Sequence, residues 1–146
     1  MLGFYNGGKV AGASQPHKHL QVVRLPLAPG RDLPIEALMK DATSAVAGLP
    51  VRHAFTRIDG HDPAALHAHY RRLLEAADVR GGPYNLLVAR DWMLLVPRSR
   101  ERFESIGMNS LAFAGALFVR DDEEMKTVGR VGPMAVLRGI AYPEDS

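Results

Sequence analysis

The sequence contains no cysteine among its 146 residues, which excludes disulfide bonds and thiolate metal sites. It also lacks any apolar run approaching the ~20 residues that cross a bilayer. The net charge is only +2, so there is no broad basic surface of the kind that binds nucleic acid. The first residues include Gly, Asn and Lys, and they do not form the apolar segment of a signal peptide. These absences predict a cytoplasmic protein that binds neither nucleic acid nor membranes.

The sequence does have the material for a folded core. Hydrophobic residues make up 47% of the chain and charged residues 23%, as in ordinary globular proteins. A chain of 146 residues is long enough for one such core. Neither a linker nor an internal repeat interrupts it, so we expect a single domain over residues 1–146.

Hydrophobic periodicity predicts a mixed structure in which strands and helices alternate. Neighbouring strands are joined by hairpins and loops, which favours an antiparallel sheet with helices packed on it, an α+β fold. Residues 98–102 are expected to form an exposed, charged loop. The predicted strands are 2–5, 18–25, 51–58, 84–89, 92–97 and 110–119, and the predicted helices are 33–46, 62–77, 121–128 and 134–141. Asp62 and Asp121 are the expected N-caps of two of these helices, Arg90-Asp91 is the expected hairpin turn, and Trp92 is expected in the core.

Residues 6–23 are the most informative stretch of the chain. Residues 6–16 form a loop of glycines and small polar residues, and the strand after it places His17, His19 and Gln21 on one face. Their spacing along a strand is roughly 6.5–7 Å. Together with the backbone amides of the loop, this pattern indicates a nucleophile beside a phosphate cradle. The residues alone leave two other interpretations open: an ordinary glycine loop, or a histidine pair from a metal site or a polar sheet face.

Four segments carry a resemblance to a known family. Gly3-Phe-Tyr-Asn6 and Gly12-Ala-Ser-Gln-Pro-His-Lys-His-Leu-Gln21 resemble the active-site segment of diadenosine tetraphosphate phosphorylases, also called ATP adenylyltransferases. Residues 84–99 and 109–120 resemble the C-terminal region of the same family. The family belongs to the histidine-triad superfamily, in the branch that includes galactose-1-phosphate uridylyltransferase. Its members are about twice as long, so the chain looks like their C-terminal half.

The resemblance implies a transfer reaction. Diadenosine tetraphosphate and phosphate would give ATP and ADP, with His19 attacking the α-phosphorus to form an adenylyl-histidine. An imidazole suits this role because its unperturbed pKa is about 6.5. His17 would help to hold the geometry. Gln21 stands where hydrolases of the superfamily have a third histidine, and an amide donates a hydrogen bond to phosphate but cannot shuttle a proton.

The same resemblance implies a set of substrate-binding residues, and it names adenine nucleotides and phosphate as partners. We predict no metal ligands, because the chain has no cysteine and no histidine pair at helical spacing. The charge of a polyphosphate makes Mg²⁺ a candidate helper, although no carboxylate cluster points to it. The implied binding residues are Asn6, Gly12, Ala13, Ser14, Gln15, Gln21, Asn109, Ser110, Leu111 and Arg120.

Two alternatives stand beside this prediction. The chain could be a non-catalytic or split fragment that binds adenine nucleotides and needs the missing N-terminal half, carried by a partner chain. A homodimer whose partner closes the pocket would instead support independent activity. It could also be a sugar-nucleotide uridylyltransferase. The run Gly12-Ala-Ser-Gln15 ahead of His19 matches the adenylyl branch better.

Overall fold

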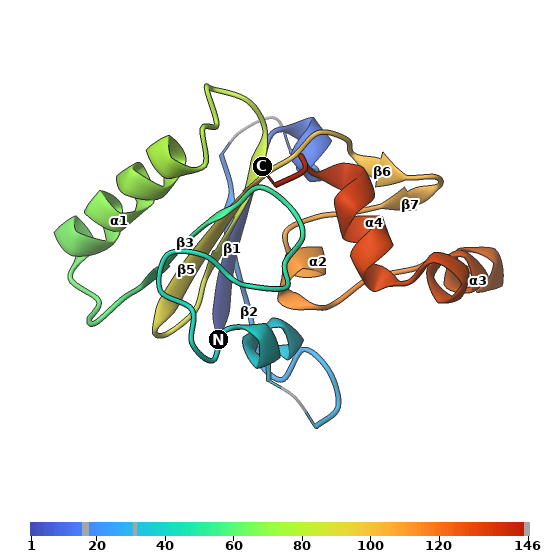
Figure 1. The fold of residues 1–146 in the computed structure, drawn as a ribbon, viewed down its shortest axis with the longest axis horizontal. Coiled ribbons are helices and arrows are strands. Elements are labelled where there is room, and N and C mark those ends of the chain that lie inside the picture. The colour runs from blue at the N-terminus through green and yellow to red at the C-terminus, as the bar shows by residue number, and fades with distance from the viewer. Residues whose placement is uncertain (16–17, 31, 145–146) are drawn as a thin grey trace.

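The computed structural model describes residues 1–15, 18–30 and 32–144. Its centre is a five-stranded sheet in the order β2-β1-β4-β5-β3, and every neighbouring pair is antiparallel. The strands are β1 (Leu2–Gly7), β2 (Leu20–Val23), β3 (Ala54–Arg57), β4 (Tyr84–Val88) and β5 (Trp92–Pro97). Helices pack on this sheet (Figure 1), so the predicted α+β class is confirmed.

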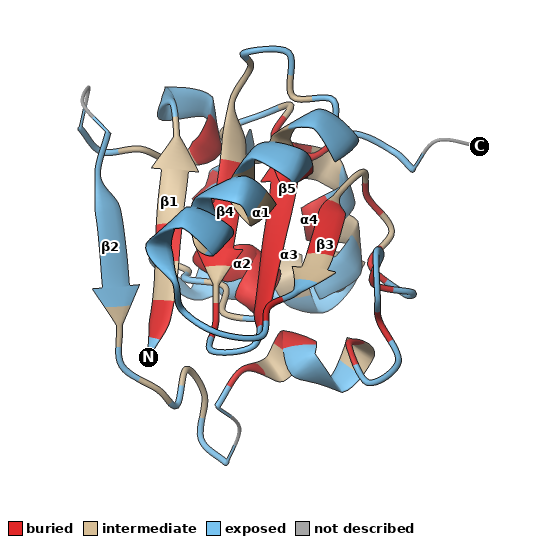
Figure 2. Ribbon diagram, turned by 90° about the vertical axis from the view of Figure 1, so that its left-hand side faces the viewer, coloured by how far each residue is buried: buried red, intermediate tan, exposed pale blue. Residues whose placement is uncertain are grey.

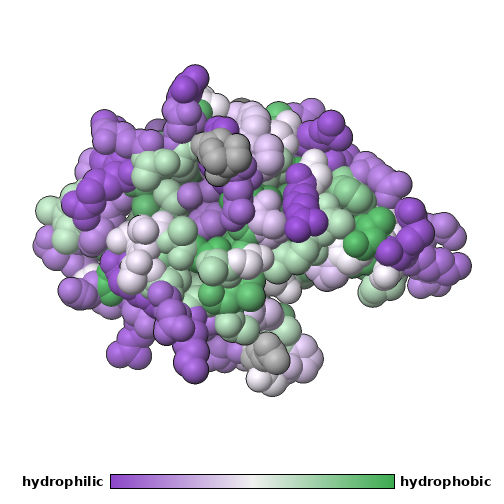
Figure 3. Space-filling view, in the orientation of Figure 1, coloured by the Kyte–Doolittle hydropathy of each residue, from purple (hydrophilic) through white to green (hydrophobic). Residues whose placement is uncertain are grey.

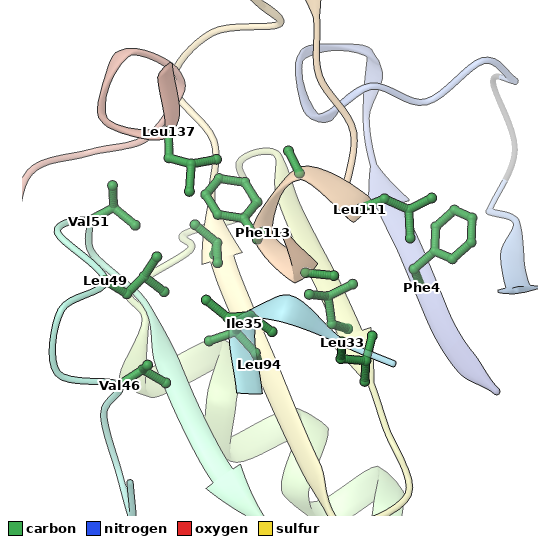
Figure 4. Packing of buried hydrophobic residues seen from close by; sticks show 14 of the residues in the cluster. Phe4, Leu33, Ile35, Val46, Leu49, Val51, Leu94, Leu111, Phe113 and Leu137 are labelled. Carbon is green, nitrogen blue, oxygen red and sulfur yellow. The ribbon is translucent and has the colours of Figure 1, made fainter. Parts of the chain in front are cut away.

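The two faces of the sheet are covered differently. Helix α1 (Pro63–Ala76) lies over one face, where it packs on β3 and β5. The other face carries the larger apolar core, in which Ile35, Leu94 and Phe113 come together from three different elements (Figure 4). The elements on that side are η2 (Pro34–Leu38), α2 (Leu111–Ala114) and α4 (Pro133–Ile140), with α3 (Asp122–Val131) and the short strands β6 (Arg102–Phe103) and β7 (Ile106–Gly107) further out (Figure 1).

Strand β2 forms one edge of the sheet, and α1 does not extend over it (Figure 2). Leu20 and Val22 consequently expose 66% and 62% of their surface. On the face seen in Figure 3, hydrophilic side chains surround a smaller apolar area. Within the described ranges, no helix has the length and apolar character needed to cross a bilayer.

Several sequence predictions are confirmed. The hairpin of β4 and β5 has the expected strands, and α1 begins as its cap predicts: the Asp62 carboxylate accepts from the Ala65 amide at 3.1 Å, with Pro63 in the first turn. Asp121 caps α3 in the same way, accepting from the Glu124 amide at 2.9 Å. Trp92 is fully buried in the core.

The predicted helix over residues 33–46 is wrong. Only η2 is helical, as a 3-10 turn, although Ile35, Met39 and Val46 are buried as the periodicity required. Arg57 occupies the carbonyl groups of Met39 and Ala42, which an α-helix would need for its own ladder. In this segment the apolar periodicity identifies the buried residues but does not predict the backbone conformation.

The predicted strand over residues 110–119 is also wrong. The segment forms the single turn of α2, which ends at Gly115 with φ +105°. A Cβ at Gly115 would lie 2.6 Å from the Cβ of Pro34, so the turn packs directly on the start of η2. A short apolar run does not distinguish a strand from a buried helical turn. The strands predicted at 18–25 and 51–58 are shorter, at Leu20–Val23 and Ala54–Arg57.

Candidate active site

The loop after β1 is closed by its own backbone. The amides of Ala11 and Ala13 donate to the Gly8 carbonyl at 3.0 and 3.1 Å, around the 3-10 turn η1 (Lys9–Ala11). Among the described residues, the amides of Ser14 and Gln15 have no acceptor. In the predicted cradle, the amides of Ser14 and Gln15 can therefore donate to a ligand, and the amides of Ala11 and Ala13 stabilise the turn.

Gly12 lets this loop pack against the segment that precedes α2. Its φ of +92° is left-handed, and a Cβ there would lie 2.4 Å from the Met108 carbonyl oxygen and 2.9 Å from the Asn109 Cα. Any side chain would force the two backbones apart. This close approach therefore requires glycine at position 12.

Asn6 joins β1 to the same segment. Its amide oxygen accepts from Asn85 Nδ2 and from the Ser110 backbone amide, both at 2.9 Å, and it lies 2.6 Å from the Ser110 hydroxyl. Ser110 is fully buried and its hydroxyl also lies 2.8 Å from the Tyr5 carbonyl. Because the oxygen is held by donors, the Asn6 nitrogen is left as a donor without an acceptor in the described residues.

The structure contradicts the prediction that Arg98 is exposed. The charged loop was expected to be solvated, yet this side chain is fully buried at the end of β5. Its Nη1 donates to the Ala11 carbonyl at 3.2 Å, to the Met108 carbonyl at 3.1 Å and to the Asn85 amide oxygen at 2.7 Å. Burial lowers the pKa of Arg98 to about 10, so the guanidinium stays charged at neutral pH.

His19 and Gln21 lie beside the loop. In the register of β2, Gln21 is opposite Phe4 and Leu20 is opposite Tyr5, so Gln21 points to the side of the larger core and Leu20 to the side of α1. His17 lies outside the described residues. A narrow cleft brings six of the predicted residues together: Asn6, Ala13, Ser14, Gln15, His19 and Gln21.

Two wider hollows adjoin this cleft. One of about 350 Å³ is lined by the loop together with Lys9 and Lys18. The other, of about 680 Å³, lies toward α1 and shares Tyr5 and Lys18 with the first. Both fall in the range of small-molecule sites. In the second hollow Tyr84 is hydrogen-bonded to Tyr70, and burial raises its pKa.

The remaining predicted residues lie at different places. The side chain of Asn109 accepts from the Leu111 amide at 3.0 Å, a local turn bond just before α2 and close to Gly12. Leu111 is buried in the core beside Phe4 (Figure 4). Arg120 pairs with Glu124 at 2.8 Å and lines neither hollow nor the cleft. Their contacts with substrate stay predictions.

Across the described ranges, no group of three His, Asp or Glu side chains could hold a metal ion. The sequence analysis did not single out Asn85 and Arg98, whose side chains both donate to the Ala11 carbonyl of the loop. A signal was available for both: Asn85 is a polar residue inside the apolar run of β4, and Arg98 directly follows the apolar run of β5.

Comparison with known proteins identifies the family of this chain. The family model of the ATP adenylyltransferase C-terminal domain matches residues 47–143, and that of the Ap4A phosphorylase N-terminal domain matches residues 1–41. The chain belongs to the Ap4A phosphorylase family. Residues 1–41, which carry the loop and His19, match the model of the N-terminal domain, whereas the sequence resemblance led us to expect the whole chain to correspond to the C-terminal half.

Two curated relatives come from Saccharomyces cerevisiae. Diadenosine 5′,5‴-P1,P4-tetraphosphate phosphorylase 2 is 29% identical over 87% of this chain, and Protein APA1 is 27% identical over 82%. The solved structure of yeast Ap4A phosphorylase Apa2 in complex with Ap4A superposes on 99% of this chain with a TM-score of 0.85 at 22% identity, and its complex with AMP gives 0.75. The chain spans 47% and 45% of the two curated relatives and 55% of the Ap4A-bound structure, about half their length.

Proposed function

We propose that this chain carries the transfer site for an adenylyl group, taken from diadenosine tetraphosphate and passed to phosphate. The observation that carries the proposal is the cleft in which His19 and Gln21 meet the amides of Ser14 and Gln15 and the side chain of Asn6. A nucleophile, an amide donor and backbone donors around one point are what nucleotidyl transfer requires. The names of the yeast relatives supply the substrate.

The reaction consists of two displacements. An imidazole nitrogen of His19 forms a bond to the α-phosphorus while the bond from that phosphorus to the oxygen of the leaving ATP breaks. An oxygen of inorganic phosphate then attacks the same phosphorus, the P–N bond breaks, and ADP leaves. Gln21, Asn6 and the loop amides donate hydrogen bonds to the phosphate oxygens, where charge develops in both steps. Gln21 cannot pass a proton to water, which favours phosphate as acceptor.

We also propose that this site is completed by polypeptide equivalent to the other half of the relatives, in a second chain or upstream in the same one. The chain spans about half the length of the curated relatives. On its edge strand β2, Leu20 and Val22 are exposed beside the hollow that contains Tyr5 and Lys18. An apolar edge of this kind is normally covered.

The test is to incubate the purified chain with α-labelled ATP or diadenosine tetraphosphate and then measure intact mass and map the labelled peptide. We expect one AMP on His19 once the other half of a relative is supplied in trans, discharged by inorganic phosphate with formation of ADP. His19→Ala should lose the label completely. His69→Ala is the matched control, because His69 is an exposed histidine on α1 outside the cleft, bonded to Arg72. Label on any other residue, or label that His19→Ala retains, would contradict the proposal.

The same assay separates the alternatives. Label that appears only after the N-terminal half of a relative is added in trans identifies a split site, and label on the chain alone identifies a site that is sufficient in itself. Transfer of a uridylyl group from a labelled uridine diphosphate sugar, with none from ATP, would identify the sugar-nucleotide reaction. A folded chain that is unlabelled under every condition would show that the motif has lost its chemistry.

A further inference from the structure

Arg98 is a buried cation whose hydrogen-bond acceptors, within the part of the chain that the structure describes, are all uncharged. The cation stabilises the fold, because the Met108 carbonyl and the Asn85 amide oxygen have no other donor among the described residues. What distinguishes Arg98 is which segments of the chain its acceptors belong to. Its acceptors are the carbonyl oxygens of Ala11, Arg100, Glu101, Met108 and Ile140 and the amide oxygen of Asn85.

Two of these acceptors lie at the contact between the loop and the segment before α2. Ala11 directly precedes Gly12, and the Met108 carbonyl oxygen is the atom that a Cβ at Gly12 would approach to 2.4 Å. Nη1 of Arg98 reaches both carbonyls, at 3.2 and 3.1 Å. A single nitrogen thus joins the two backbones at the point where they come closest.

The guanidinium is itself anchored from the other side. Nε donates to the carbonyl of Ile140, the last residue of α4, at 3.3 Å, and the partial negative charge at a helix C-terminus favours a cation there. Nη2 donates to the carbonyls of Arg100 and Glu101 at 2.9 and 3.1 Å. Arg98 is therefore held rigidly by elements that are remote from the loop in sequence.

We infer that Arg98 is a positioning residue for the loop. Its guanidinium holds Ala11 against Met108 and thereby keeps the amides of Ser14 and Gln15 and the side chain of Asn6 in place beside His19. Asn85, which donates to the Ala11 carbonyl at 2.7 Å, shares the task. The effect on nucleotides rests on the proposed function, whereas the hold on the loop does not.

The experiment compares Arg98→Met and Arg98→Lys with Leu73→Ala. Leu73 is a buried residue of the separate apolar cluster under α1, so its truncation destabilises the fold without touching the loop. The first readout is trypsin cleavage of the native protein after Lys9, an exposed residue of the loop, relative to cleavage after Lys126, an exposed residue of α3. This ratio reports local opening of the loop. The second readout is the affinity for ATP.

For Arg98→Met we expect the cleavage ratio to rise about tenfold or more, because charge-assisted hydrogen bonds to the loop are lost. ATP affinity should fall in parallel. Arg98→Lys, which keeps the charge and some of the donors, should lie between it and the wild type. Leu73→Ala should lower the melting temperature and leave both the ratio and the ATP affinity near wild-type values.

A ratio in Arg98→Met that equals the ratio in Leu73→Ala would overturn the inference, and so would an opened loop with unchanged ATP affinity. If the wild type itself binds no ATP, the proposed function fails and the cleavage ratio alone decides whether Arg98 holds the loop. If Arg98→Met does not fold, Arg98→Lys against Leu73→Ala provides the same comparison.

Discussion

The loop that carries the motif has a buried side and an exposed side, and the two are built differently. On the buried side, Ala11 and Gly12 contact backbone and the side chains of Asn85 and Arg98 at fixed distances. On the exposed side, Ser14 and Gln15 present amides with no acceptor in the described residues. The comparison teaches that the residues proposed to perform the chemistry and the residues that fix the geometry of the loop are largely separate sets, with Asn6 in both. Each set can therefore be perturbed by itself.

The largest effect is expected from Gly12→Ala, which breaks the buried side. The new Cβ meets the Met108 carbonyl at 2.4 Å in a left-handed backbone, so we expect a loss of roughly 3 kcal/mol in the free energy of unfolding and loss of adenylylation. Urea denaturation and the labelling assay measure the two effects. Gly81→Ala is the control, because Gly81 has φ +74° but no atom of the described chain within 4 Å of the added Cβ. It should cost about 1 kcal/mol. Equal losses in the two variants would show that the close approach is unimportant.

This division explains what the sequence could reveal. The residues on the exposed side carry a local motif, so His19, Gln21 and the loop were predicted from neighbours in the chain, and the structure brings them into one cleft. The buried side depends on contacts between distant segments, such as Asn6 with Ser110 and Arg98 with Ala11. No local pattern encodes such pairs. Arg98 was expected in solvent because arginine is usually exposed.

The fold shows the same limit. Elements with end signals were predicted well: α1 has its Asp62 cap, and the β4–β5 hairpin has turn residues between two apolar runs. Residues 33–46 and 110–119 show only hydrophobic patterns, and these record burial without recording backbone conformation. In both segments tertiary contacts determine the backbone conformation. Arg57 binds the backbone carbonyls of the first segment, and Pro34 packs against Gly115 in the second.

A smaller loss of stability is expected when the buried carboxylate of Glu124, which is remote from the loop, loses its partner Arg120. Glu124 is buried and accepts from Arg120 and Ser105, and the bonds to Arg120 lower its pKa from 4.5 to about 2. Because the folded pKa lies below the ordinary value, this carboxylate stabilises the fold fully above about pH 4.5, and the contribution is lost as the pH falls toward 2. Arg120→Leu should therefore be less stable than the wild type at pH 7, with a difference that shrinks between pH 4.5 and 2.

Urea denaturation over that pH range measures the difference, and adenylylation at pH 7 is the second readout. Arg120 lines neither the cleft nor the hollows, so destabilisation at α3 should leave the labelling of His19 unchanged at temperatures where the variant is folded. A constant difference in stability across the pH range would contradict the role of the ion pair. Loss of labelling in the folded variant would instead connect Arg120 to the substrate, as the resemblance implied.

The smallest effect on stability is expected from Gln21→Ala, which changes the exposed side alone. Gln21 is exposed on the edge strand β2, so the free energy of unfolding should stay within about 0.5 kcal/mol of the wild type. Its amide is expected to donate to the phosphate in both displacements, so the rate at which phosphate discharges the adenylyl group should fall by tenfold or more. Rapid-quench measurement of ADP formation tests this against Gln21→Glu, which keeps the size but has no donor. If Gln21→Glu keeps the wild-type rate, donation by the amide is not what Gln21 contributes. If Gln21→Ala unfolds the chain, the exposed side also supports the fold, and the separation of the two sides does not hold.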